Sequence, residues 1–242
     1  MTVSALFGQL QGSDPFNRGV QIRLLKAVLF DYDGVLVNSM SYHVQAWQIV
    51  FKDFNIDIRP EDVLLTEGAR SIELAREILS KHTFSISEDK LVEFVNKKQR
   101  TYHEITGARF LEDAGKFILK IKKSAMRIGV VSGGARFDIE KLLPPGVRAQ
   151  IDVIVSGDEV RNGKPDPEGY LKAARALDVP PGECLVIENA PFGIQAAKFA
   201  GMKVAAIATT LSRRHLIGAD FYARDLAELE KNWDEINTNS KM

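Results

Sequence analysis

Short apolar runs recur along the chain and predict buried strands. Each run is flanked by polar or turn-forming residues, a pattern that suits the strands of a parallel sheet covered on both faces. Stretches with helical spacing of apolar residues accompany the later runs. The predicted strands cover residues 27–30, 128–131, 153–155, 185–187 and 204–207, and the predicted helices cover 114–121, 137–143, 167–177 and 192–200. This alternation predicts an α/β fold with a doubly wound, Rossmann-like parallel sheet.

The segment between the first two predicted strands departs from this alternation. A connection of this length without secondary structure would be unusual in a compact domain. Its apolar residues recur at helical spacing in three groups: Val44, Trp47, Phe51 and Phe54; Ile72, Ala75 and Leu79; Leu91, Phe94 and Val95. Residues 39–109 are therefore predicted to form an inserted α-helical cap domain. This cap either elaborates the fold or closes over a site at the end of the first strand.

The domain boundaries follow from this insertion. Residues 23–38 and 110–230 are expected to form the α/β core domain. Residues 1–22 contain turn-forming residues such as Gly12 and Pro15, and are expected to be an N-terminal tail. Residues 231–242 are expected to be a C-terminal tail.

Composition and charge change this picture little. Of the 242 residues, 45% are hydrophobic and 26% are charged, and the formal net charge is +0. A globular chain with no nucleic-acid and no membrane partner is therefore expected. No apolar run approaches the ~20 residues of a membrane span, and the N-terminus lacks the pattern of a signal peptide. Cys184 is the single cysteine, which excludes an intramolecular disulfide and favours a reducing, cytoplasmic setting.

Two aspartates stand at the end of the first predicted strand. Asp31 and Asp33 follow an apolar run directly and are separated by one residue. Residues i and i+2 of an extended segment lie on the same side, so the two carboxylates are expected to converge. Two like charges at one point favour a bound cation. Taken alone, the same residues also suit a simple Asp-Gly turn.

Three further strand ends carry polar residues suited to phosphate and metal chemistry. Ser132 and Gly133 offer a hydroxyl and backbone amides at the start of a predicted helix, a setting that suits anions. Lys164 begins a Lys-Pro-Asp-Pro sequence, whose prolines stiffen the loop around one cation. Glu188 and Asn189 offer the hard oxygen ligands that Mg²⁺ prefers. Each motif alone would be an ordinary turn or a solvated lysine.

Together these motifs resemble those of the haloacid dehalogenase superfamily of phosphohydrolases. The resemblance rests on Asp-Tyr-Asp-Gly-Val-Leu from Asp31, Val-Val-Ser ending at Ser132, Gly-Lys-Pro-Asp-Pro-Glu-Gly-Tyr from Gly163, and Val-Ile-Glu-Asn ending at Asn189. It covers nearly all of residues 26–229. The insertion point resembles that of the helical cap in the β-phosphoglucomutase-like branch.

The resemblance implies a role for each matching residue. Asp31 would be the nucleophile that forms an aspartyl-phosphate, and Asp33 would protonate the leaving group and then activate water. Ser132 and Lys164 would hold the phosphoryl oxygens. The implied Mg²⁺ ligands are Asp31, the backbone carbonyl of Asp33, and the Glu188 and Asn189 pair. Dehalogenases and phosphonate hydrolases of the superfamily lack the second aspartate, so phosphate-ester or phosphoanhydride chemistry is expected.

Some residues depart from the common pattern of the family. Most relatives carry two carboxylates where this chain has Glu188 and Asn189, so the metal would be less well neutralised. In the cap, Glu67 stands where sugar-phosphate mutases of this branch have a basic residue, and it either reaches the Mg²⁺ or faces solvent. The combination of Asn38-Ser39-Met40, Tyr42-His43, Glu67-Gly68 and Glu188-Asn189-Ala190-Pro191 resembles a subgroup that hydrolyses inorganic pyrophosphate.

Several alternatives stay open at this point. His43 either touches substrate or is a polar residue of the first cap helix, and Arg70 could clamp a distal phosphate. The favoured hypothesis is a Mg²⁺-dependent phosphohydrolase that acts on pyrophosphate or another small phosphorylated metabolite. The alternatives are a sugar-phosphate phosphatase, a β-phosphoglucomutase, or a catalytically silent binding protein. A monomer or a weak homodimer is expected.

Overall fold

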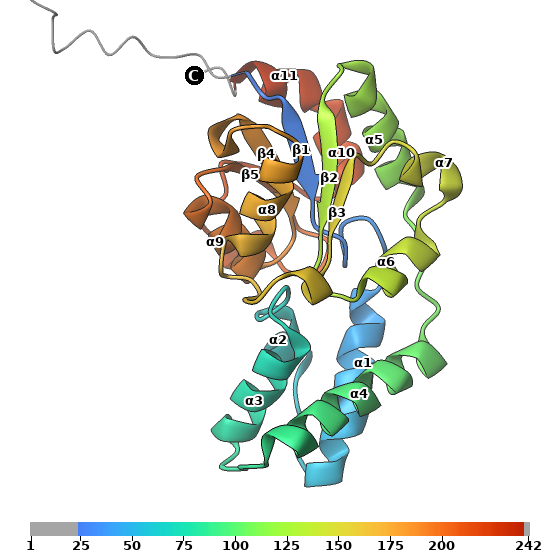
Figure 1. Ribbon diagram of the computed structural model, residues 1–242, viewed down its shortest axis with the longest axis vertical. Coiled ribbons are helices and arrows are strands. Elements are labelled where there is room, and N and C mark those ends of the chain that lie inside the picture. The colour runs from blue at the N-terminus through green and yellow to red at the C-terminus, as the bar shows by residue number, and fades with distance from the viewer. Residues whose placement is uncertain (1–23, 240–242) are drawn as a thin grey trace, which may run out of the picture.

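The computed structural model describes residues 24–239, and these contain a six-stranded parallel sheet (Figure 1). The strands are β1 (Ala27–Phe30), β2 (Arg127–Val131), β3 (Val153–Val155), β4 (Cys184–Glu188), β5 (Lys203–Ile207) and β6 (Phe221–Ala223), in the order β3-β2-β1-β4-β5-β6. The five predicted strands are present, and the predicted α/β fold is confirmed. The short β6 was not predicted, and the expected tail of residues 1–22 lies outside the described residues.

The register of the central strands brings their carboxyl ends to one edge. Phe30 of β1 lies beside Val130 of β2 and Ile187 of β4. The residues that follow these strands therefore meet at the same edge, which is where open parallel sheets place their ligands.

Helices cover both faces of this sheet (Figure 1). One face packs against α5 (Glu112–Lys123), α6 (Arg136–Leu142), α10 (Leu226–Lys231) and α11 (Trp233–Asn239), and the other packs against α8 (Glu168–Ala176) and α9 (Pro191–Phe199). A further short helix, α7 (Pro145–Arg148), follows α6. Val28 and Phe30 of β1 point into the first layer, whereas Ala27 and Leu29 point into the second. The alternation of side chains along β1 thus gives the core domain two apolar layers.

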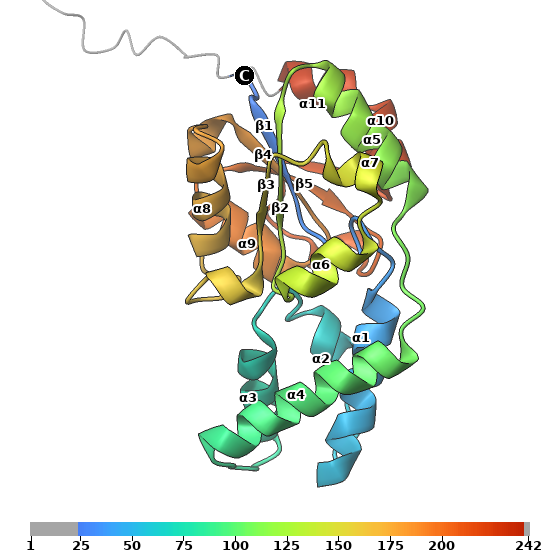
Figure 2. The same ribbon diagram turned by 45° about the vertical axis from the view of Figure 1, so that its right-hand side comes forward.

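The insertion after β1 forms a separate group of helices beyond the carboxyl edge of the sheet (Figures 1 and 2). Its elements are α1 (Met40–Phe51), a 3₁₀ turn (Lys52–Phe54), α2 (Pro60–Leu64), α3 (Ser71–Lys81) and α4 (Glu88–Ile105). These helices share their own apolar core, in which the rings of Trp47, Phe51 and Phe94 pack together. No helix within residues 24–239 is long and apolar enough to cross a membrane.

Two chain segments connect the cap helices to the sheet, and they are paired with each other. Val37 and Phe110 form an antiparallel bridge. Next to it, the Asn38 amide donates to the Arg109 carbonyl at 3.1 Å, and the Arg109 amide donates to Asn38 Oδ1 at 2.6 Å. A side-chain oxygen thus provides one of the hydrogen bonds that join the two connections.

The C-terminal region differs from the sequence prediction. Residues 231–242 were expected to be a tail, but residues 233–239 form α11. Trp233 is 1% exposed, and its ring packs edge-on against Phe117 of α5 at 5.2 Å between centroids. Ile236, one helical turn later, is also buried. In the sequence, the signal for this helix is the spacing of Trp233 and Ile236 by about one helical turn. Two apolar residues in an otherwise polar segment are too few to predict a helix.

We expect Trp233→Ala to destabilise the protein by about 3–5 kcal/mol, because it removes a large buried ring from the layer beneath α5. Urea unfolding followed by circular dichroism would measure the loss. Phe199→Ala is the matched control, because Phe199 is an aromatic residue that is 68% exposed. Equal losses in the two variants would contradict the burial of α11 against the core.

Candidate active site

A buried lysine between two carboxylates forms the centre of the candidate site. Lys164 Nζ lies 2.5 Å from Asp31 Oδ1 and 2.7 Å from Glu188 Oε1. Asp31 follows β1, Glu188 ends β4, and Lys164 lies in the loop before α8. All three side chains are buried. Charges buried in this way must be paired, so the position of each carboxylate depends on the lysine.

Glu188 is fully occupied by donors from the protein. Oε1 accepts from Lys164 and from the Tyr170 hydroxyl, at 2.7 Å each, and Oε2 accepts from the backbone amides of Asn189 and Ala190. A carboxylate has about four acceptor positions, and all are used here. Glu188 therefore orients Lys164 in the metal-free protein, and its predicted role as a metal ligand stays a prediction.

Close packing around Glu188 requires a glycine in the following helix. A Cβ atom at Gly193 of α9 would lie 1.6 Å from Glu188 Oε1. The start of α9 therefore approaches the carboxylate only because residue 193 has no side chain.

Burial and charge set the proton affinities of this centre. Burial raises the pKa of Asp31 well above its usual range, and the Glu188 charge adds to the rise, while Lys164 opposes it. Burial lowers the pKa of Lys164, but Asp31 and Glu188 outweigh burial and raise it. The lysine therefore stays protonated. A further cation near Asp31 would stabilise the ionised carboxylate.

The second aspartate is held by residues from both domains. Asp33 Oδ1 accepts from the Ser39 hydroxyl at 2.5 Å and lies 3.2 Å from His43 Nε2, and Oδ2 accepts from the Ser132 hydroxyl at 3.4 Å. Burial raises the pKa of Asp33, but His43, Ser39 and Lys98 together outweigh burial and lower it. The pKa values of the two adjacent carboxyl groups are therefore shifted in opposite directions in the metal-free protein: Asp31 tends to hold a proton, and Asp33 tends to be ionised.

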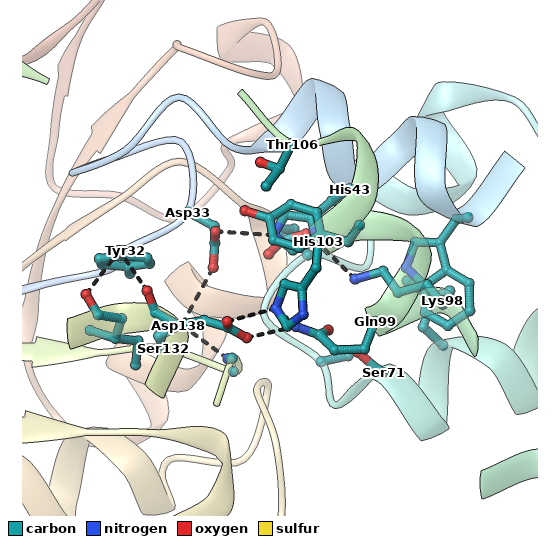
Figure 3. A pocket seen from close by; sticks show the side chains of 18 of the residues that line it. Tyr32, Asp33, His43, Ser71, Lys98, Gln99, His103, Thr106, Ser132 and Asp138 are labelled. Carbon is teal, nitrogen blue, oxygen red and sulfur yellow. Dashed lines mark hydrogen bonds and ion pairs between the residues drawn. The ribbon is translucent and has the colours of Figure 1, made fainter. Parts of the chain in front are cut away.

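A buried lysine of the cap, which the sequence analysis did not identify, fixes the orientation of His43. Lys98 Nζ of α4 lies 2.8 Å from His43 Nδ1 (Figure 3). An ammonium group only donates, so Nδ1 accepts and Nε2 carries the proton directed at Asp33. The His43 ring also stacks on Tyr102 at 4.1 Å. Burial and the Lys98 charge lower the pKa of His43, and burial lowers the pKa of Lys98 to about 8.

The cap loop that carries Glu67 lies directly on the core. A Cβ atom at Gly68, which has φ of +89°, would lie 2.6 Å from Lys164 Cδ, and one at Gly133 would lie 3.1 Å from the Gly68 carbonyl oxygen. Glu67 lines the cavity beside Asp33. Burial, then the Asp33 charge, raises the pKa of Glu67 to about 8. The predicted approach of Glu67 to the core site thus has a physical basis, while its binding to a metal stays a prediction.

Arg70 lies away from this cavity. Its Nη1 donates to the Arg161 carbonyl of the core at 2.8 Å, and a Cβ atom at Gly163 would lie 2.7 Å from Arg70 Cγ. Arg70 therefore anchors the cap loop to the loop that carries Lys164. Arg70 also lines a smaller adjacent cavity together with Lys164, and its predicted clamp on a distal phosphate stays a prediction.

A cavity of about 90 Å³ lies between the cap and the core. Its polar lining includes Asp33, Ser132, Gly133 and Asp138 from the core and His43, Glu67, Lys98, Gln99 and His103 from the cap. Asp31 and Lys164 do not line it, and Lys164 instead lines an adjacent cavity of about 20 Å³ together with Ser132 and Gly133. Asp31, the predicted nucleophile, is thus covered while the cap loop lies on the core, so a substrate would reach it only after the cap opens.

The donor set near Asp31 fits a magnesium ion. Asp31 Oδ2 and Asn189 Oδ1 are buried side-chain oxygens without a hydrogen-bond partner among the described residues. Asn189 Nδ2 donates to the Asp33 backbone carbonyl at 3.0 Å. A carboxylate, an amide oxygen and a main-chain carbonyl are hard oxygen donors of the kind Mg²⁺ prefers. In residues 24–239, no cluster of three or more His, Cys, Asp or Glu side chains suits a metal, so the amide and carbonyl oxygens would be needed.

The raised pKa of Glu67 predicts a pH-dependent change in stability for the metal-free protein. Because the folded state holds this proton up to about pH 8, whereas a glutamate in the unfolded chain loses it near pH 4.5, ionisation of Glu67 destabilises the fold as the pH rises between those values. We expect Glu67→Gln to gain stability relative to the unchanged protein across this range. Urea unfolding in EDTA at several pH values measures the difference, and a difference that does not vary with pH would contradict the burial of Glu67.

Comparison with known proteins places this geometry in a family. The model of the haloacid dehalogenase-like hydrolase family matches residues 28–207. Validoxylamine A 7'-phosphate phosphatase of Streptomyces hygroscopicus subsp. limoneus is 32% identical over 216 residues, which cover 88% of this chain and 99% of that protein. The β-phosphoglucomutase of Bacillus subtilis (strain 168) is 30% identical over 214 residues, which cover 85% and 92%.

A solved structure shows the same likeness in three dimensions. The crystal structure of β-phosphoglucomutase from Clostridium difficile superposes with a TM-score of 0.78 at 25% identity, and the match covers 89% of this chain and 98% of that one. These matches confirm the predicted resemblance. The chain belongs to the haloacid dehalogenase-like hydrolase family, and it is an enzyme of the phosphatase type whose relatives are β-phosphoglucomutase-like.

Proposed function

We propose that this enzyme is a Mg²⁺-dependent phosphohydrolase that acts through an aspartyl-phosphate on a small substrate, with inorganic pyrophosphate as the first candidate. One observation carries the proposal. Asp31 has one carboxylate oxygen bound to Lys164 and the other without a partner, and the neighbouring Asp33 faces the cavity between cap and core.

The residues of the core divide the reaction into two displacements. An Asp31 oxygen attacks phosphorus and forms a new P–O bond while the bond to the leaving group breaks. Asp33 is ionised in the substrate-free site, and the negative charge of the bound phosphoryl group would raise its pKa so that it takes up a proton and gives it to the leaving oxygen. Asp33 then accepts a proton from water as the water attacks the same phosphorus, which releases phosphate and restores Asp31. Lys164 and Ser132 stabilise the negative charge on the phosphoryl oxygens.

A bound Mg²⁺ would neutralise charge on the phosphoryl group and on Asp31. Asp31, the Asp33 carbonyl and Asn189 would hold it, and Glu67 would be a further ligand from the cap. The partnerless Asp31 and Asn189 oxygens support the first part of this assignment. The position of Glu67 in the cavity beside Asp33 supports the second part.

The preference for a small substrate rests on the cavity. Its volume of about 90 Å³ is far below the roughly 300–1,000 Å³ of sites for drug-sized ligands. Glu67 occupies the place of the basic residue of sugar-phosphate mutases, so the wall lacks that cation for the second phosphate of a sugar bisphosphate. Both features favour hydrolysis of a small phosphoanhydride over a mutase reaction.

A sugar-phosphate phosphatase is the second candidate. The names of the two relatives above, a phosphatase of a 7'-phosphate and a phosphoglucomutase, favour it. A β-phosphoglucomutase activity is less consistent with Glu67. A catalytically silent binding protein is the remote alternative, because the pairing of Asp31, Lys164 and Glu188 would then have no use beyond stability.

The first experiment is Mg²⁺-dependent phosphate release from pyrophosphate, p-nitrophenyl phosphate and common sugar phosphates. We expect pyrophosphate to lead by about tenfold or more in kcat/KM, which is about 1.4 kcal/mol of transition-state stabilisation. EDTA and Asp31→Asn should each abolish release. Sugar phosphates leading the panel would replace the pyrophosphate proposal with the second candidate, and no release from any compound would support a silent protein.

Glu67→Gln tests whether the Glu67 carboxylate takes part in Mg²⁺ binding and in pyrophosphate hydrolysis. If the carboxylate binds Mg²⁺, the variant should need more Mg²⁺ for half-maximal activity and should lose about tenfold in kcat/KM for pyrophosphate. Glu61→Gln, which makes the same change at an exposed carboxylate of cap helix α2 outside the cavity, is the control. Unchanged Mg²⁺ dependence and turnover in Glu67→Gln would leave Glu67 without a role in the reaction.

A further inference from the structure

The cap and the core also meet at a second cluster on the wall of the cavity. Asp138 of core helix α6 accepts from Gln99 Nε2 at 2.6 Å, and its other oxygen lies 2.7 Å from His103 Nε2. Gln99 and His103 belong to cap helix α4. All three side chains line the cavity and converge in Figure 3. We call these three residues the Asp138 latch.

The core side of this latch is held rigidly. The Tyr32 hydroxyl donates to the Ile139 carbonyl at 3.0 Å, which ties α6 to the residue between Asp31 and Asp33. At the start of α6, the Arg136 amide donates to Asp158 Oδ2 at 2.9 Å, and Arg136 Nη2 donates to the Ile154 carbonyl at 2.6 Å. Helix α6 is therefore a fixed support, and α4 is the part that moves when the cap opens.

The residues of the Asp138 latch also form part of the cavity wall, which a leaving group would contact. Both oxygens of Asp138 are engaged by the cap, so Gln99 and His103 lie against α6 and do not face an open channel. A small leaving group fits inside the cavity with these bonds intact. A larger leaving group must break these hydrogen bonds, and their loss then raises the free energy of its transition state.

We propose that Asp138 is a specificity-determining residue: it latches α4 to α6 and thereby restricts the enzyme to small leaving groups. The choice of substrates in its test rests on the proposed function, but the latching itself does not. Asp138 touches neither Asp31 nor Asp33 in the hydrogen-bond network, so its effect is on closure and on leaving-group size.

The test compares Asp138→Ala and Gln99→Ala with a matched control. In Asp53→Ala, the control, the change removes the ion pair between Asp53 and Lys97, which also involves α4 but lies wholly within the cap. Two quantities are measured for each full-length variant. One is the ratio of kcat/KM for p-nitrophenyl phosphate to that for pyrophosphate, and the other is amide hydrogen exchange in the cap loop of residues 66–70.

Both latch variants should raise the kcat/KM ratio by about fivefold or more and speed exchange in residues 66–70, because the cap spends more time open. The control should match the unchanged protein in both. If neither phosphate compound is hydrolysed by the unchanged protein, the proposed function fails. The rate of amide hydrogen exchange in residues 66–70 then tests by itself whether Asp138 latches the cap. Unchanged exchange in both latch variants would overturn the latch, and faster exchange with an unchanged ratio would overturn its role in specificity.

Discussion

The pairing of Lys164 with two buried carboxylates is the constraint on which the site depends. A buried ammonium and two buried carboxylates are each costly alone, and they are tolerated together because every charged atom except one Asp31 oxygen has a partner. The parallel register of β1 and β4 brings the two acids together, and the loop before α8 supplies the lysine. Tyr170 and the glycine at 193 complete the shell by filling the remaining acceptor positions of Glu188 and by making room for it. One Asp31 oxygen is left over, and it is the oxygen that the proposed function assigns to Mg²⁺.

The second half of the site belongs to the cap as much as to the core. Ser39 and His43 reach Asp33 from the start of the insertion, and Lys98 reaches His43 from a helix more than fifty residues later. The charge and orientation that Asp33 experiences are therefore complete only when α1 and α4 lie against the sheet. Under the proposed function, closure of the cap and the positioning of Asp33 as acid–base group are one event, which would tie the chemistry to the exclusion of water.

The sequence predicted the fold and the positions of the core acids well, because both depend on local pattern. Short apolar runs located β1 to β5, and the residues that follow β1, β2 and β4 had to meet at one edge of the sheet. What it could not predict depends on how distant segments pack. Lys98 continues the apolar stripe of Phe94 by four residues, but only the placement of α4 over His43 gives it a purpose. The occupation of Glu188 and the outward contact of Arg70 depend in the same way on glycines and carbonyls from other loops.

The two hydrogen bonds between Asn38 and Arg109 bear on how the cap can move relative to the core. The two strands that connect the domains are bonded to each other in both directions, and Val37 and Phe110 continue the pairing. Two independent tethers would let the cap swing, twist and slide. A paired ribbon bends readily about one line only, across its own plane. Such a paired connection would favour rotation of the cap about a single hinge axis, so that each closure brings the same side chains back to the same partners.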